Sequence, residues 1–134
     1  MGRSNYLHSE ITQKIIHSYF VVYNRLCYGF LEKVYQNALM IELKNANLEC
    51  KSQVPINVYY DNQIIGHYIA DILVNDCVII EIKAAVSLCE EHEAQLTNYL
   101  KATEIEVGIL LNFGKVPQFK RKVFSAKYKN HNLS

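Results

Sequence analysis

The sequence predicts one domain of mixed α/β class, more closely α+β, in which a central mixed sheet is flanked by helices. Three observations predict it: helical periodicity in the first third, a run of strand-like segments separated by turn signals, and a further helical segment between the last strands. The 134 residues are 50% hydrophobic and 20% charged, which suits one hydrophobic core and excludes a disordered chain.

Two helices are expected first. Apolar residues recur every three or four positions over residues 9–26, and Ser9 is a suitable N-cap. Gly29 interrupts this pattern, and a second helix is expected over residues 31–46. At about 100° per residue, Glu32 falls inside the apolar arc of this second helix. A carboxylate at that position needs a specific reason.

Three consecutive strands are expected at residues 49–60, 63–74 and 77–84. The pairs Asp61–Asn62 and Asn75–Asp76 are turn signals between them, so the three strands should form an antiparallel meander. Pro55 favours an edge or bulged position for the first strand. The third strand is apolar enough to lie in the centre of the sheet.

The chain then returns to helical periodicity over residues 90–102 and continues into a buried strand at 105–112. A short edge strand is expected at 121–125. The helix should join two parallel neighbouring strands by a right-handed crossover. All of these elements fit in a single domain spanning residues 1–134.

Charge is distributed unevenly along the chain. The 14 Lys and Arg residues nearly balance 13 Asp and Glu residues, which argues against binding nucleic acid by bulk charge alone. Residues 107–134 nevertheless contain no acidic side chain, and all of their basic side chains lie in the segment 115–134. This basic segment is either a solvated tail or a phosphate-facing surface in which Phe119 and Tyr128 alternate with cations.

The cysteine pattern and the N-terminus suggest a cytoplasmic protein. The four cysteines lack C-x-x-C spacing and are expected to be reduced and mostly buried: Cys27, Cys50, Cys77 and Cys89. Glu10 and Lys14 interrupt the apolar stretch that a signal peptide would need. No apolar run approaches the length of a membrane span.

Charged residues inside apolar strands are the main functional signal. Glu81 and Lys83 lie two residues apart, so both point to one face about 6.6 Å apart along the strand. Asp71, on the preceding strand, should lie beside Glu81 across the second turn. A structural ion pair is one explanation, because burying an unpaired charge costs several kcal/mol. The other is a phosphodiesterase site, since two carboxylates suit Mg²⁺ and an ammonium group can hold a water.

Three motifs resemble the PD-(D/E)XK nuclease superfamily. Asp71 followed by Glu-Ile-Lys at 81–83 is similar to its D-x(n)-(D/E)-x-K signature, although Ala70 stands where the named motif has proline. Gln-Leu-Thr-Asn-Tyr at 95–99 is similar to the Q-x-x-x-Y element of the RecB-like branch. Gly-Phe-Leu-Glu-Lys-Val-Tyr at 29–35 matches the motif that names the GxxExxY protein family.

The resemblance implies a restriction-endonuclease-like αβββαβ core with an extra N-terminal helix. It also implies a Mg²⁺ or Mn²⁺ site at Asp71, Glu81 and the backbone carbonyl of Ile82, with Lys83 as the catalytic lysine. Glu32 would reach the metal or its water. From the residues alone, Glu32 is also explained as a first-turn carboxylate favoured by the helix dipole.

The remaining candidates surround this proposed site. Gln95 and Tyr99 share a helix face, and Gln95 either binds a metal water or the scissile phosphate or makes an ordinary hydrogen bond. Tyr35 is expected in the core, with its hydroxyl at the edge of the cleft. His67 and His92 are expected to be core or surface histidines in preference to ligands.

The sequence thus predicts a Mg²⁺-dependent nuclease that hydrolyses phosphodiester bonds by in-line attack of water, with DNA expected over RNA as substrate. The alternative is a nucleic-acid-binding or assembly module that keeps the nuclease fold and cuts nothing. A chain of 134 residues leaves little beyond the core for sequence readout. A homodimer or a protein partner is therefore expected to supply specificity.

Overall fold

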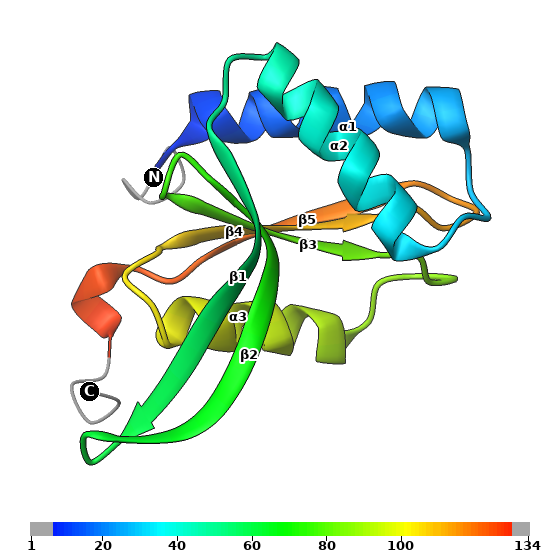
Figure 1. Cartoon of the computed structure of the whole chain (residues 1–134). Coiled ribbons are helices and arrows are strands. Elements are labelled where there is room, and N and C mark those ends of the chain that lie inside the picture. The colour runs from blue at the N-terminus through cyan, green and yellow to red at the C-terminus, as the bar shows by residue number, and fades with distance from the viewer. Residues whose placement is uncertain (1–6, 130–134) are drawn as a thin grey trace.

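The computed structural model describes residues 7–129, and these form one mixed sheet with helices on both faces (Figure 1). In chain order the elements are α1 (Ser9–Leu26), α2 (Glu32–Asn45), β1 (Cys50–Tyr60), β2 (Gln63–Val74), β3 (Val78–Lys83), α3 (Glu90–Lys101), β4 (Val107–Asn112), β5 (Gln118–Val123) and a short 3-10 helix, η2 (Ala126–Tyr128). The strands follow one another across the sheet in the order β1-β2-β3-β4-β5, with β3 and β4 parallel and the other neighbours antiparallel. The predicted fold class is confirmed.

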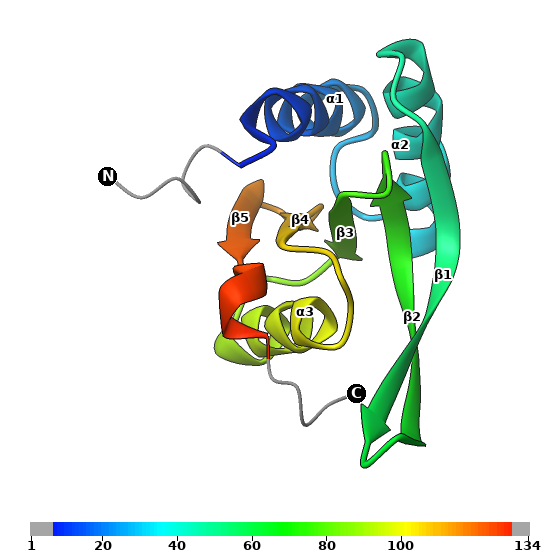
Figure 2. The ribbon, with the colours of Figure 1, turned by 90° about the vertical axis from the view of Figure 1, so that its left-hand side faces the viewer.

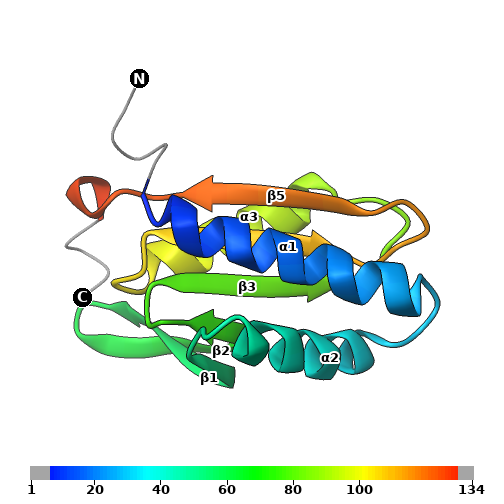
Figure 3. The ribbon, with the colours of Figure 1, turned by 90° about the horizontal axis from the view of Figure 1, so that it is seen from above.

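Each face of the sheet packs against different helices. Figure 3, seen from above, shows α1 and α2 lying across one face, and Figure 1 shows α3 beneath the other. Ile80 and Ile82 belong to the hydrophobic core under α1 and α2, whereas Ile79 belongs to a second core with Leu96 and Leu100 of α3. Because side chains alternate along a strand, Glu81 and Lys83 follow Ile79 toward α3.

Two tight turns fix the register of the first three strands. Asp61 and Asn62 have φ values of 50° and 61°, and Asn75 and Asp76 have φ values of 50° and 54°. Positive φ at both central residues suits the two-residue hairpin turn at Asp61–Asn62, and Asn and Asp tolerate it. The second connection has one residue more, because Cys77 also lies between the paired Val74 and Val78. The second turn pairs Ile72 with Ile80 and brings Asp71 to the level of Glu81.

The β1–β2 hairpin extends beyond the rest of the sheet. Figures 1 and 2 show its far end passing below α3, with the strands curving toward that helix. Its far half carries several exposed apolar side chains: Tyr59, Tyr60, Ile64, Ile65, Tyr68 and Ile69. β1 is an edge strand, as Pro55 predicts.

Three local predictions are wrong. Ser9 is the first residue of α1 and not its N-cap, because His8 occupies the cap position in the left-handed conformation, with φ 54° and no side-chain cap bond. The last strand runs over Gln118–Val123 and begins earlier than expected. The four cysteines are free as predicted, but Cys27 and Cys89 are exposed because they flank helix ends, and the other two are partly buried.

Much of the basic C-terminal segment is used inside the fold. Lys122 forms an ion pair with Glu93 of α3, and Arg121 donates to the carbonyl of Leu7. The Lys129 ammonium donates to carbonyls at and beyond the C-terminal end of α3, those of Leu100, Thr103 and Ile105. These three cations therefore stabilise the domain and form no continuous phosphate-facing row, and the side chain of Tyr128 lies outside the described part. None of the helices in residues 7–129 is long and apolar enough to cross a membrane.

Candidate functional site

The site begins where β2 and β3 separate. Backbone pairing between these strands ends at Ile72 and Ile80. Beyond this point, two carboxylates accept hydrogen bonds from backbone amides across the strands. The Asp71 amide donates to Glu81 Oε2 at 2.8 Å, and the Ile82 amide donates to Asp71 Oδ2 at 2.8 Å. Each carboxylate thus holds a backbone amide of the opposite strand. The second oxygen of each has no hydrogen-bond partner within residues 7–129.

Both carboxyl groups are shielded from water, and their negative charges lie close to each other. Only 4% of Glu81 is exposed, and burial, followed by the nearby charge of Asp71, raises the pKa of Glu81 to about 8. Burial also raises the pKa of Asp71, and the hydrogen bond from Ile82 opposes that shift. The charge of Lys83 lowers both pKa values without offsetting the burial. The pair therefore lacks positive charge, which a cation bound to the two remaining oxygens would supply.

The donor set fits Mg²⁺ in part. No group of three or more His, Cys, Asp or Glu side chains in the described part of the chain is arranged to hold a metal ion. Mg²⁺ is commonly bound by one or two carboxylates and several waters, so two carboxylates and a backbone carbonyl are a suitable set. Because Glu81 and Asp71 are held by backbone amides, their free oxygens have little freedom to move away.

Lys83, Gln95 and Tyr99 form a hydrogen-bonded chain beside the carboxylates. Lys83 Nζ donates to Gln95 Oε1 at 3.3 Å, and Gln95 Nε2 donates to the Tyr99 hydroxyl at 2.8 Å. Burial, followed by the charge of Glu81, raises the pKa of Tyr99. The two bonds orient the Gln95 amide with its oxygen toward Lys83. Lys83 has two further N–H donors for water or a phosphate oxygen.

Glu32 approaches the same strand end from α2. It is the first residue of that helix, and its Oε2 accepts a hydrogen bond from the Ala84 amide at 3.3 Å, directly after β3. Its charge contributes to the raised pKa values of Asp71 and Glu81. Glu32 is exposed and does not lie within the apolar arc of α2, because the first turn extends beyond the packed part of the helix.

Tyr35 and Gly29 hold the loop that presents Glu32. The Tyr35 ring is fully buried and stacks on Phe113, with centroids 4.3 Å apart. Its hydroxyl donates to the Cys27 carbonyl at 2.6 Å and accepts from the Phe30 amide at 3.1 Å. Gly29 has φ 118°, a conformation that favours glycine. Tyr35 is thus a core residue whose hydroxyl is engaged in the loop.

Asn112 is a polar residue near the site that sequence reasoning missed. It is fully buried at the end of β4, next to the end of β3 in the parallel pair. Its side-chain amide accepts from the Ala85 N–H and donates to the Ala85 carbonyl, both at 2.9 Å. This pair of hydrogen bonds fixes the segment after β3. An asparagine that ends an apolar run was the signal available in the sequence.

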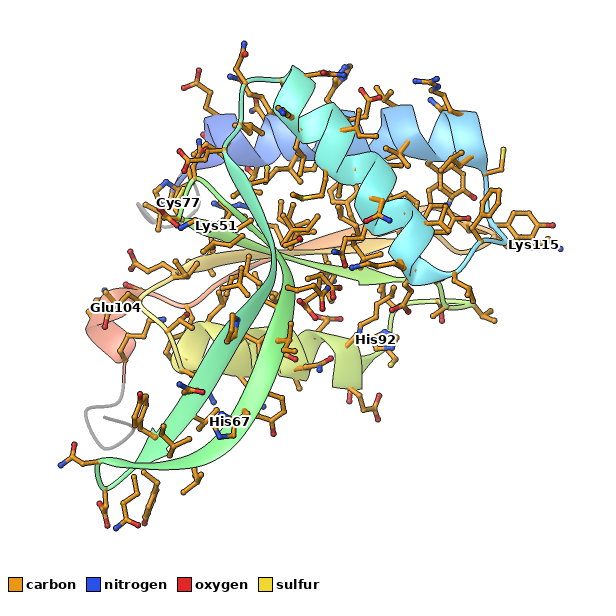
Figure 4. The ribbon with its side chains drawn as sticks, in the orientation of Figure 1. Lys51, His67, Cys77, His92, Glu104 and Lys115 are labelled. Atoms are coloured by element: carbon orange, nitrogen blue, oxygen red, sulfur yellow. The ribbon has the colours of Figure 1, made fainter. Side chains whose placement is uncertain are left out.

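Neither histidine joins the carboxylates. His67 Nδ1 is 2.8 Å from Asn57 Oδ1 on the exposed hairpin, and Figure 4 shows it far along that hairpin. His92 accepts a hydrogen bond from the Cys89 amide at the start of α3. Both are surface or structural residues, in agreement with expectation.

Two open grooves flank the site. The hairpin groove, of about 490 Å³, lies between the β1–β2 hairpin and α3 and is lined by Val58, Ile65, Tyr68, Gln95, Asn98 and Tyr99 among others. The loop groove, of about 740 Å³, lies on the side of Glu32 and is lined by Tyr28, Phe30, Glu32, Ala84, Val86 and Lys115 among others. Gln95 and Tyr99 link the first groove to the site, and Glu32 links the second.

Comparisons with known proteins agree with this fold. No curated protein matches the chain. The crystal structure of SSO0001 is similar, with a TM-score of 0.54 and 22% sequence identity over 68% of this chain and 48% of that one. The chain therefore spans about half the length of that structure, and the likeness shows the fold alone. The family model described as the PD-(D/E)XK nuclease superfamily matches residues 9–123, and the chain belongs to this superfamily.

Proposed function

We propose that the chain is a divalent-metal-dependent nuclease whose reaction centre is formed by Asp71, Glu81 and Lys83. Membership of a superfamily of hydrolytic nucleases supports the reaction class. The observation that carries the proposal is the pair of interlocked carboxylates, Asp71 and Glu81, with raised pKa values and an ammonium group beside them. A purely structural role would be served as well by apolar residues.

In this proposal Asp71, Glu81 and the carbonyl of Ile82 hold Mg²⁺ or Mn²⁺, and Glu32 reaches the ion or its water. When bound, the ion supplies Lewis-acid polarisation of the phosphoryl oxygen and a more acidic water. Asp71 and Glu81 are oriented for this role by the amides that donate to them. The exposure of Glu32 suits a residue at the open side of the centre.

Lys83 holds the attacking water and offsets negative charge that develops on the phosphoryl group. Gln95 keeps the Lys83 ammonium in place, and its own orientation is set by Tyr99. The phosphate is positioned by Gln95 and by the free N–H donors of Lys83. Hydrolysis then proceeds by in-line attack, with the leaving oxygen opposite the water.

The test is cleavage of single- and double-stranded DNA and RNA by the purified chain with Mg²⁺ or Mn²⁺. Glu81→Ala and Lys83→Ala should each lower the rate by about 100-fold or more, since each removes a group that acts at the reacting phosphate. Glu10→Ala and Lys14→Ala remove exposed charges on α1 and should cleave like the wild type. If all of these proteins show the same cleavage, or none cleaves at all, the nuclease assignment is wrong.

A non-catalytic module is the second candidate. It is favoured by the lack, within residues 7–129, of three metal-ligating side chains already arranged for an ion. Calorimetry with Mn²⁺ separates the two. Loss of Mn²⁺ binding in Asp71→Ala supports a working centre, whereas nucleic-acid binding that persists unchanged in that variant, without cleavage by the wild type, supports the module.

The finer classification belongs to the same proposal. The motif at residues 29–35 supports the GxxExxY family, and Gln95 with Tyr99 supports the RecB-like branch. Each residue of the first motif has a different role. Gly29 adopts the positive φ of the loop, the Tyr35 hydroxyl is hydrogen-bonded to the loop backbone, and Glu32 faces the site. DNA is proposed over RNA, with a second copy or another protein adding recognition. The cleavage panel and light scattering test these two points.

A further inference from the structure

We infer that the hairpin groove binds an unpaired nucleobase of the substrate strand, so that the strand is single at the point of cleavage. The inference names the substrate class of the proposed nuclease and rests on that function. The groove is continuous with the reaction centre, because Gln95 and Tyr99 line it and also form the hydrogen-bonded chain from Lys83. A base in this groove would lie next to the phosphate held at the centre.

The shape and chemistry of the groove fit a nucleobase. Tyr68 is 49% exposed, and its ring contacts that of Tyr99 in a tilted arrangement with centroids 5.7 Å apart, so the ring is held in place and still offers exposed aromatic surface for stacking. Val58 and Ile65 give apolar walls, and Asn98 adds an amide that can meet the polar edge of a base. A flat ring with polar edges matches this combination.

Gly66 keeps the groove open beside Tyr68. A Cβ added at this position would lie 3.3 Å from Cε2 of the Tyr68 ring and 3.7 Å from the Val58 Cβ. Even an alanine would therefore push against the ring that forms the stacking surface. The glycine leaves this wall free of side-chain atoms.

The charge around the groove disfavours a duplex. A protein that follows two phosphate backbones needs rows of cations, whereas the groove lining has one acidic residue, Glu91, and one basic residue, Lys101. The start of α3 is acidic, and only Glu93 there has an ion-pair partner, Lys122, among the described residues. Binding by aromatic stacking needs fewer phosphate contacts.

The loop groove supports the same strand path on the other side of the centre. Tyr28 and Phe30 are about half exposed there, and the exposed Lys115 adds a positive charge to the same lining. Two exposed aromatic surfaces on either side of one centre suit a strand whose successive bases are unstacked from a partner strand.

The experiment measures binding, so its outcome does not depend on cleavage. Fluorescence anisotropy of a labelled single-stranded oligodeoxynucleotide is recorded with a chelator and, separately, with Ca²⁺. Tyr68→Leu should weaken binding by about tenfold, because it removes the stacking ring and keeps an apolar side chain. The control is Tyr60→Leu: Tyr60 lies on the same hairpin, is 57% exposed and does not line the groove, so its loss should change affinity less than about twofold.

A second matched pair guards against local rearrangement. Ile65→Glu places a negative charge in the groove, and Ile64→Glu places the same charge at the neighbouring residue, which does not line the groove. Both residues are exposed, so both variants should fold, as thermal unfolding can verify. Ile65→Glu should weaken binding more than Ile64→Glu.

The inference is overturned if Tyr68→Leu and Tyr60→Leu bind alike, if a duplex of the same sequence binds as tightly as the single strand, or if the wild type binds no single strand under either condition. Failure of the proposed nuclease looks different: the wild type binds the single strand through Tyr68 and cuts nothing with Mg²⁺ or Mn²⁺.

Discussion

On the face of β3 toward α1 and α2, Val78, Ile80 and Ile82 are buried and entirely apolar, whereas the face toward α3 carries Glu81 and Lys83 after Ile79. One strand of six residues thus contributes to a core on one side and presents charged groups on the other. The difference teaches that one face of β3 can be packed entirely with apolar side chains while the other face joins its own core only through Ile79. It leaves the other face able to hold charges that folding alone would not select.

The largest expected effect is on the apolar face. Ile80→Ala should lower the free energy of unfolding by about 3–4 kcal/mol, because it leaves a cavity in the core under α1 and α2. Ile41→Ala, which shortens an exposed side chain of α2, should cost less than about 0.5 kcal/mol. Urea unfolding measures both. Equal losses in the two variants would mean that the apolar face of β3 contributes no more to the free energy of unfolding than an exposed position.

On the charged face, metal-free protein should become more stable when Glu81 is replaced by Gln. The folded-state pKa of Glu81 is raised to about 8 from 4.5, so the folded form holds a proton that the unfolded form releases. The contribution of Glu81 to stability is therefore greatest below about pH 4.5 and falls as the pH rises toward 8. Glu81→Gln should remove this fall, a gain of a few kcal/mol at pH 8, while abolishing cleavage.

Thermal unfolding from pH 5 to pH 8 with a chelator checks this sign, and Glu10→Gln, which changes an exposed carboxylate on α1, is the control. Mg²⁺ should restore the stability of the wild type at pH 8 and leave Glu81→Gln unchanged. A wild type that gains stability over this pH range relative to Glu81→Gln would contradict the assignment.

The smallest of these effects concerns the loop that presents Glu32. Tyr35→Phe keeps the ring on Phe113 and removes the hydroxyl that binds Cys27 and Phe30. It should cost about 1 kcal/mol of unfolding free energy, and cleavage should fall through misplacement of Glu32. Tyr60→Phe, which removes an exposed hydroxyl away from both grooves, serves as the comparison. An unchanged rate in Tyr35→Phe would show that the loop hydroxyl does not position Glu32.

The sequence carries the parts of this arrangement that depend on local rules. Asn75 and Asp76 begin the three-residue connection between the paired Val74 and Val78, the resulting register places Asp71 next to Glu81, and alternation directs both to the α3 side. These steps need no knowledge of distant residues. For the same reason the elements and the convergence of these two carboxylates were predictable.

The missed features depend on contacts between distant segments. Lys129 binds carbonyls at the end of α3, which are 24 to 29 residues away, so its use inside the fold has no local signature. The exposure of Cys89 follows from its place at the start of α3, and the groove beside Tyr68 requires the curvature of the hairpin. Apolar character alone does not separate these environments.

At Asp71 and Glu81 the hydrogen bonds between strands are made by side-chain carboxylates and not by backbone carbonyls, and this has a consequence for hydrogen exchange. Two amide protons, those of Asp71 and Ile82, are protected from solvent by side chains in place of the strand ladder. Their hydrogen-exchange rates therefore report the state of the two carboxylates directly, whereas amides deeper in the sheet report global unfolding. Where β2 and β3 separate, the exchange rates of these two amides should therefore respond to a cation or phosphate that binds at the site.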